Sequence, residues 1–172
     1  MVDAVKRLLL VVDYQKDFVD GALGFPGAEA LDGPIAAKIA ACRAAGDDVA
    51  FTLDTHGPDY LDTQEGRKLP VPHCLLNSEG WQLYGQTGQA MERSRDMVIG
   101  KGAFPSLWLA NWLKEQGYDR VELAGLVSYL CVLSNAIMVK AALPEAGPVI
   151  LEPFGTLRAH VPGDNTGDIM GD

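Results

Sequence analysis

The sequence predicts a doubly wound α/β fold, in which a mainly parallel sheet carries helices on both faces. Two observations support this prediction. First, the chain contains short unbroken apolar runs, most clearly Leu8–Val12, which are typical of strands buried on both faces. Second, these runs alternate with longer segments that have the apolar spacing and the end signals of helices. Strands that alternate with helices build βαβ units and hence a parallel sheet.

The elements follow one another along the chain. The first strand is predicted at Leu8–Val12, where Asp13 ends the apolar run. An Ala-rich helix is predicted over residues 34–45, because Pro34 favours a helix start and Gly46 follows its end. Two further helices are predicted from their apolar faces, at Ser106–Gln116 and over residues 129–143. The remaining strands are predicted at Asp48–Leu53, Asp96–Ile99, Arg120–Leu126 and Pro148–Leu151.

Two segments fall outside this alternation. Residues 55–80 are rich in Gly, Pro, Asp and Thr, and they are too long for a simple connection, which predicts a functional loop. The last residues, about 160–172, are rich in Gly and Asp and are expected to form a flexible or loosely docked tail. The length of 172 residues suits one domain that spans residues 1–172.

The charge balance excludes some classes of function. Fourteen basic against 23 acidic residues give a formal charge of −9, which disfavours binding to nucleic acid or to a membrane surface. The apolar run near the N-terminus is far too short to span a membrane. The three cysteines are odd in number and too few for a disulfide framework, so we expect a reducing, cytoplasmic location.

Chemically active residues follow four of the predicted strands. Asp13 follows the first strand, Asp54 and His56 the second, Lys101 the third, and Cys131 stands a few residues after the fourth. In a parallel sheet, ligands bind at the carboxyl ends of the strands. The sequence therefore predicts one crevice that holds an acid, a pair of metal-type ligands, an amine and a thiol.

Cys131 has two interpretations. A free cysteine in an apolar helix is usually a small buried hydrophobe. In the first turn of a helix, however, the free amides and the helix dipole favour a thiolate. Lys101 would lower the thiol pKa further, and Asp13 could accept the proton. Backbone amides at the same helix start could hold an oxyanion, so the group as a whole predicts acyl transfer.

A metal site is the second candidate. Asp54 and His56 are two residues apart at the end of an extended strand, so their side chains point to the same face. His73 could complete a set of two histidines and one carboxylate, which suits Zn²⁺, Fe²⁺ or Mn²⁺. An isolated Asp-x-His would more often be a capped turn with an incidental histidine. Two of the three histidines of the chain fall in this stretch, which favours the interpretation that they are metal ligands.

These motifs, in this order, resemble those of the isochorismatase-like cysteine hydrolases, and among them the nicotinamidases and pyrazinamidases. The resemblance spans about residues 7–152. It implies the doubly wound fold of that family, with Cys131 attacking an amide carbonyl, Asp13 as general acid and base, and Lys101 stabilising charge. The segments that carry it are VVDYQKDF around Asp13, Asp54-Thr55-His56, His73-Cys74, IGKGAF around Lys101 and GLVSYLCV around Cys131.

The resemblance also implies ligands and partners. It implies one divalent metal ion per site (Zn, Fe or Mn), held by Asp54, His56 and His73, with Glu65 as a candidate further ligand. It implies a small-molecule amide substrate and a homo-oligomer. A cis peptide bond would map to Val127–Ser128, and Phe18 would wall the substrate pocket. The residues assigned to substrate or oxyanion binding are Phe18, Gln15, Val127 and Ser128.

The sequence departs from the family pattern around the substrate. Nicotinamidases usually have Trp where this chain has Thr55, and their nucleophile segment usually reads T-D-Y-C rather than Ser128 to Cys131. Candidates for a replacement aromatic wall are Tyr60, Trp81 and Tyr129. The predicted function is hydrolysis of a small amide, with nicotinamide first. The alternatives are hydrolysis of a ureido or carbamoyl compound, and a catalytically idle relative that serves in binding or regulation.

Overall fold

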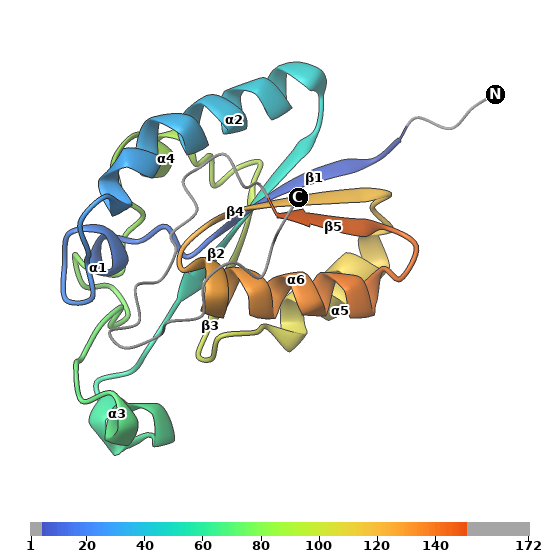
Figure 1. The fold of residues 1–172 in the computed structure, drawn as a ribbon. Coiled ribbons are helices and arrows are strands. Elements are labelled where there is room, and N and C mark those ends of the chain that lie inside the picture. Colours follow the sequence, from blue (N-terminus) through green and yellow to red (C-terminus); the bar gives the residue numbers. More distant parts are fainter. Residues whose placement is uncertain (1–4, 151–172) are drawn as a thin grey trace, which may run out of the picture.

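A five-stranded parallel sheet forms the centre of the structure (Figure 1). The computed structural model describes residues 5–150, so the predicted tail at about 160–172 lies outside the described residues. The strand order is β3-β2-β1-β4-β5, and every neighbouring pair is parallel. The strands are β1 (Arg7–Val12), β2 (Asp48–Asp54), β3 (Met97–Lys101), β4 (Arg120–Gly125) and β5 (Gly147–Ile150).

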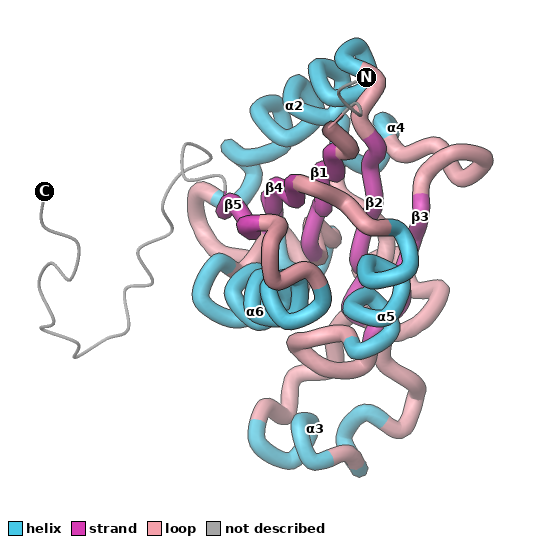
Figure 2. Tube along the Cα trace, turned by 90° about the vertical axis from the view of Figure 1, so that its right-hand side faces the viewer, coloured by secondary structure: helices cyan, strands magenta, loops and turns pink. Residues whose placement is uncertain are grey.

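Helices cover both faces of the sheet, which confirms the predicted doubly wound fold. Figure 2 shows α2 (Asp32–Ala45) and α4 (Gly85–Ala90) on one side of the strands. The other side carries α5 (Leu107–Gln116) and α6 (Leu133–Ala142). The winding direction reverses between β1 and β4, because β2 lies on one side of β1 and β4 on the other. Ligands of such folds bind at this reversal, next to the carboxyl ends of the strands.

Strand β1 is buried on both faces, as its unbroken apolar run predicts. Leu9 and Val11 pack into the core beneath α2, while Leu8, Leu10 and Val12 pack into the core beneath α5 and α6. All five side chains are at most 1% exposed. Fully burying one such side chain contributes about 2 kcal/mol, so this strand anchors both layers of the molecule.

Local signals explain where the long helices begin and end. The Ser106 hydroxyl accepts a hydrogen bond from the Leu109 amide and caps the start of α5. Gly46 and Gly117 follow α2 and α5 in the left-handed conformation, at φ +81° and +65°. The Asp32 carboxylate in the first turn of α2 accepts from the Gln86 and Thr87 amides, which ties α4 to α2.

Several boundaries differ from the sequence prediction. Lys101 is the last residue of β3 rather than the residue that follows this strand. The helix predicted over residues 129–143 is a π-helical turn, η3 (Ser128–Val132), followed by α6. Short helices were not predicted, because one or two turns are too short to show apolar periodicity. They are α1 (Lys16–Val19), η1 (Ala28–Leu31), η2 (Tyr60–Asp62), α3 (Gln64–Lys68) and α4. Of these, η2 and α3 lie within the predicted loop of residues 55–80.

The cis peptide bond joins Leu126 to Val127, so the expected position at Val127–Ser128 is wrong by one residue. The chain leaves β4 at Gly125, and the turn toward η3 begins there. Within residues 5–150, no helix is both long and apolar enough to cross a membrane.

Gly125 lets β1 and β4 come close together at their carboxyl ends. It pairs with Val12 in the sheet and has φ +129°, a backbone conformation that side chains rarely allow. A Cβ atom at Gly125 would lie 1.9 Å from the Val12 carbonyl oxygen. The next amide, of Leu126, donates to that same oxygen at 2.9 Å. The glycine therefore sets how close the turn that carries Cys131 comes to the strand that carries Asp13.

We expect the substitution Gly125→Ala to lower the free energy of unfolding by about 3–5 kcal/mol, since it adds both a backbone clash and a strained φ. Urea denaturation followed by circular dichroism measures this loss. Gly46→Ala is the matched control, because φ is also positive there but no atom lies within 4 Å of the added Cβ. It should cost about 1–2 kcal/mol. Equal losses in the two variants would contradict the role assigned to Gly125.

Candidate active site

The predicted strand-end residues meet at the carboxyl edge of the sheet. Asp13 directly follows β1, Asp54 ends β2, and Lys101 ends β3. Cys131 lies in η3, the turn that follows β4. The parallel strand order brings these ends together, since β1 lies between β2 and β4. All four side chains are buried, with residue exposures of 5% or less.

An acid, an amine and a thiol lie in contact at this edge. Lys101 Nζ is 2.5 Å from Asp13 Oδ2 and 3.8 Å from Cys131 Sγ. The ammonium also donates to the Ala103 carbonyl oxygen at 3.2 Å, which fixes its direction. The lysine therefore stands between the carboxylate and the sulfur and touches both.

Asp13 is held in place by β2. Its Oδ1 accepts from the Thr52 hydroxyl at 2.6 Å, and its amide donates to the Thr52 carbonyl at 3.1 Å. Asp13 has φ +48°, a conformation that costs a residue other than glycine about 1–3 kcal/mol. The sheet end stabilises this strained geometry, which turns the carboxylate toward Lys101. Thr52 was not among the residues picked from the sequence, because its role depends on the pairing of β1 with β2.

Burial governs the protonation of the three groups. Burial raises the pKa of the Cys131 thiol well above its usual range, the negative charge of Asp13 adds to this, and Lys101 opposes it without outweighing it. Burial also raises the pKa of Asp13, although Lys101 lowers it. Burial alone would lower the pKa of Lys101. Electrostatic interactions with Asp13, Cys131 and Asp54 outweigh burial and raise this pKa above its usual value, so the amine stays charged.

These shifts correct one expectation from the sequence. A thiolate stabilised by the helix start and by Lys101 was expected, whereas the buried site favours a neutral thiol at rest. A carboxylate with a raised pKa is a stronger base than a free one. The arrangement therefore suits a proton transfer from Cys131 to Asp13 that accompanies attack on a substrate.

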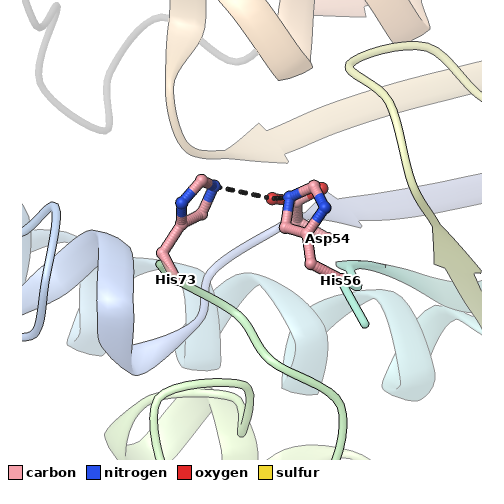
Figure 3. A group of neighbouring side chains, drawn as sticks. All are labelled: Asp54, His56 and His73. Atoms are coloured by element: carbon pink, nitrogen blue, oxygen red, sulfur yellow. Dashed lines mark hydrogen bonds and ion pairs between the residues drawn. The ribbon is translucent and has the colours of Figure 1, made fainter. Parts of the chain in front are cut away.

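The second group is a set of two histidines and one carboxylate, drawn in Figure 3. Asp54 Oδ2 lies 3.0 Å from His56 Nε2 and 3.3 Å from His73 Nε2. One ligand atom from each residue lies within 4.8 Å of the others, and all three residues are buried. Burial would raise the pKa of Asp54, but the two imidazoles and Lys101 together lower it below its usual range. Two imidazoles and an ionised carboxylate are donors that fit Zn²⁺, Fe²⁺ or Mn²⁺.

Neighbouring groups orient the two imidazoles. His73 Nδ1 lies 2.8 Å from the Val71 carbonyl, a contact that leaves Nε2 directed at Asp54. The Tyr60 ring packs against both imidazoles, with centroid distances of 4.7 Å to His56 and 5.0 Å to His73. Glu65 Oε1 is 3.8 Å from the Nε2 atoms of both histidines, so α3 brings the candidate further ligand to the same place.

A cavity of about 230 Å³ lies between the thiol and this carboxylate–histidine set. Pockets for drug-sized ligands usually hold about 300–1,000 Å³, so this cavity suits a smaller molecule. Its walls are largely aromatic and aliphatic, and its polar atoms come from a few residues. The lining residues are Phe18, Leu23, Phe25, Asp54, Glu65, Leu69, His73, Phe104, Val127, Tyr129, Leu130 and Cys131.

Two of the four residues assigned to substrate or oxyanion binding line this cavity, Phe18 and Val127, and Ser128 does not. Gln15, which was also assigned to this group, is fully buried and is not among the lining residues. Its Nε2 donates to the Asp54 carbonyl at 2.9 Å, and its Oε1 accepts from the Asp54 amide at 2.7 Å. Gln15 therefore positions the backbone of a candidate metal ligand.

Among the three candidates for an aromatic wall, Tyr129 lines the cavity and is 50% exposed. Tyr60 stands behind the imidazoles, with its hydroxyl donating to the Leu69 carbonyl. Trp81 donates from Nε1 to the Thr55 hydroxyl at 2.8 Å, so it contacts the residue between Asp54 and His56 from outside. Leu23, Phe25 and Phe104 also line the cavity, and they were not picked from the sequence because apolar loop residues carry no motif.

A parallel α/β sheet with a thiol, an amine and an acid at its switch point suits an enzyme of the hydrolase class. Residues 7–142 match the isochorismatase domain family, and the chain belongs to this family. The match covers all of the site residues described above.

Relatives of known structure or activity support this assignment. The chain is 27% identical over 146 residues to a nicotinamidase/pyrazinamidase of Mycobacterium tuberculosis, with 76% of each chain covered. A pyrazinamidase/nicotinamidase of Streptococcus mutans superposes with a TM-score of 0.74 at 26% identity, covering 84% of each chain. An N-carbamoylsarcosine amidase of Thermoplasma acidophilum superposes with a TM-score of 0.73 at 26% identity, covering 86% of this chain and 82% of its own.

Metal affinity should rise with pH between pH 6 and pH 8. Burial would lower the pKa of His73, but hydrogen bonds to Asp54 and to the Val71 carbonyl outweigh it and raise that pKa. A protonated imidazole cannot bind a metal ion, so binding must displace this proton below the raised pKa, at a cost of about tenfold in affinity per pH unit.

Competition between the protein and a chromophoric chelator for Zn²⁺ at pH 6, 7 and 8 measures this dependence. His73→Ala should weaken binding and flatten its dependence on pH. An affinity of the unaltered protein that does not change over this range would contradict the ligand role of His73.

Proposed function

We propose that the protein is a metal-assisted cysteine amidohydrolase that acts on a small uncharged carboxamide, with nicotinamide as the first candidate. The observation that carries the proposal is the contact among Cys131 Sγ, Lys101 Nζ and Asp13 at the wall of a small apolar cavity. The carboxylate–histidine set Asp54, His56 and His73 stands at the same cavity. The nicotinamidase activity of two relatives at 26–27% identity supports the same substrate class.

The proposed reaction begins with the thiol. Cys131 Sγ attacks the amide carbonyl carbon while the thiol proton passes to Asp13. Backbone amides at the start of η3, where Val127 follows the cis bond, are candidates to hold the oxyanion, and the charge of Lys101 stabilises it from nearby. Collapse of the tetrahedral intermediate breaks the C–N bond, and the leaving nitrogen takes the proton from Asp13 to depart as ammonia.

A thioester on Cys131 remains. Asp13 then removes a proton from water, which attacks the thioester carbonyl. The C–S bond breaks, the carboxylic acid leaves, and Asp13 returns the proton to the sulfur. Asp13 thus acts twice as base and twice as acid, which requires a pKa raised toward the working pH. Asp54, His56 and His73 would hold a divalent ion, which would supply a Lewis acid for a ring nitrogen of the substrate. Phe18 and Tyr129 offer apolar surface to the body of the substrate.

A carbamoyl substrate is the second candidate, because one relative is an N-carbamoylsarcosine amidase. The charge of the cavity argues against it. The lining residues of the described chain include the carboxylates Asp54 and Glu65 but no lysine or arginine. A carbamoyl amino acid carries a carboxylate of its own, which would meet like charge and apolar walls.

The catalytically idle alternative is disfavoured by the geometry. A binding module has no need to bury a lysine and an aspartate in contact with a thiol, since burying each charge costs several kcal/mol. The cytoplasmic location, the single domain over residues 1–172 and the homo-oligomer stay predictions from the sequence.

We expect the purified protein to convert nicotinamide to nicotinate and ammonia. Cys131→Ala should lower kcat by at least about 10⁴-fold, because the nucleophile is lost. A coupled ammonia assay and chromatography of nicotinate measure both products. Chelator treatment should suppress turnover, and Zn²⁺, Fe²⁺ or Mn²⁺ should restore it.

Cys42→Ala is the matched control, since Cys42 is a buried thiol in α2, outside the cavity. It should leave kcat within about twofold of the unaltered enzyme, as for a substitution that touches no site. Full turnover by Cys131→Ala would contradict the proposed mechanism.

The cavity should select against anionic substrates. We expect kcat/KM for nicotinamide to exceed that for N-carbamoylsarcosine by at least about 10²-fold. Leu69 lines the cavity and is 37% exposed, so Leu69→Lys adds a cation at its mouth and should narrow this ratio about tenfold. Leu69→Met keeps the size without the charge and should leave the ratio unchanged. A preference for the carbamoyl acid would replace the first candidate with the second.

A further inference from the structure

Asn135 is a buried polar residue that the mechanism above does not use. It lies in α6, one helical turn after Cys131, and its exposed fraction is 0%. Every donor of its side-chain amide is engaged. Nδ2 donates to the Cys131 carbonyl at 2.8 Å and to the Phe104 carbonyl at 3.0 Å, and Oδ1 accepts from the Ser106 amide at 3.1 Å.

These bonds join two segments that are about 30 residues apart in the sequence. One segment is the nucleophile turn η3, in which the Cys131 carbonyl lies. The other is the loop 102–106, which leads from the end of β3 at Lys101 to the start of α5. Lys101 Nζ donates to the Ala103 carbonyl in that same loop. The loop is therefore held by Lys101 on one side and by Asn135 on the other.

The position of Asn135 also matches a break in helix regularity. Around Cys131 the chain passes from a π-helical turn into α6, so the series of bonds between residues four apart is interrupted. The Nδ2 atom supplies a donor to the Cys131 carbonyl at this break. Such turns recur at functional sites, where they direct a side chain that a regular helix would place elsewhere.

We propose that Asn135 is a positioning residue that sets the spacing between Cys131 and Lys101 by fastening the nucleophile turn to the loop after β3. The proposal rests on the catalytic roles proposed above for those two residues. Replacing the amide with an apolar group removes this partner from the buried Cys131 carbonyl and Ser106 N–H, and from the part-buried Phe104 carbonyl. The turn and the loop then move apart to find other partners, and a misplacement of about 1 Å can cost about 10²-fold in rate.

Two variants test this. Asn135→Leu keeps a branched side chain of similar size without hydrogen bonds, and Asn135→Ala removes the side chain. Ser134→Ala is the matched control, because Ser134 is the adjacent residue of α6 and is half-buried without lining the cavity. All proteins are first compared by circular dichroism, thermal unfolding and metal content, so that the kinetics refer to folded, metal-loaded enzyme.

The first readout is the steady-state kinetics with nicotinamide. We expect both Asn135 variants to lower kcat about 10–100-fold while KM changes less than about threefold, since the spacing of reacting groups matters in the transition state. Ser134→Ala should leave both constants unchanged. A residue with a purely structural role would lower the melting temperature without this difference between kcat and KM.

The second readout needs no substrate. The rate of iodoacetamide alkylation at Cys131, followed by peptide mass spectrometry, is measured at one alkaline pH at which all variants stay folded. The charged groups that face this sulfur are Lys101, Asp13 and Asp54. Loss of the lysine contact should lower this rate about tenfold in both Asn135 variants and leave it unchanged in Ser134→Ala, because a nearby cation favours the thiolate.

Each outcome decides the proposal. Folded Asn135 variants with unchanged kcat and an unchanged alkylation rate would overturn it. Failure of both variants to fold would assign Asn135 to stability alone and would also overturn it. An unaltered enzyme without activity on nicotinamide would refute the proposed function, while a lowered alkylation rate in the variants would still support the positioning role.

Discussion

The buried ion pair between Lys101 and Asp13 is the constraint on which the rest of the site depends. Removing two charges from water costs several kcal/mol for each, and contact at 2.5 Å compensates only where further polar groups complete the surroundings. Thr52 supplies a hydroxyl to the carboxylate and Ala103 a carbonyl to the ammonium. These groups lie in or next to β1, β2 and β3, so the surroundings of the ion pair form when these three strands pair. The Lys101–Asp13 ion pair therefore links the pairing of the strands to the geometry of the site.

The same ammonium links the candidate nucleophile with the candidate metal ligands. Lys101 Nζ lies 3.7 Å from Asp54 Oδ1, while the other oxygen of Asp54 faces the two imidazoles. One cation thus faces two carboxylates and a thiol in a place from which water is excluded. A divalent ion bound by Asp54 and the two histidines would neutralise the Asp54 carboxylate. Lys101 would then interact mainly with Asp13 and Cys131. The two halves of the site are on this account parts of one electrostatic cluster.

The sequence predicted the sheet and the reacting groups for the same reason. The run Leu8–Val12 is apolar at every position, so a strand buried on both faces follows without knowledge of its neighbours. Parallel strands end at one edge, so Asp13, Asp54 and Lys101 had to converge. What the sequence could not reveal depends on contacts between distant segments. Gln15 binds the backbone of Asp54, 39 positions away, and Asn135 reaches Phe104 across 31 positions. The same holds for Tyr60, which packs against imidazoles from two different segments.

The neutral resting thiol also bears on how such an enzyme avoids side reactions. A thiolate is the reactive form toward oxidants and alkylating agents, and a buried thiol with a raised pKa is largely inert. On the proposed mechanism, the thiol reacts when a substrate fills the cavity and offers a carbonyl carbon to the sulfur, and the proton passes to Asp13 in the same step. Burial of the ion pair behind the cavity wall acts in the same direction. The low polarity around Lys101 would strengthen its field at the charge that the proposed mechanism places on the carbonyl oxygen.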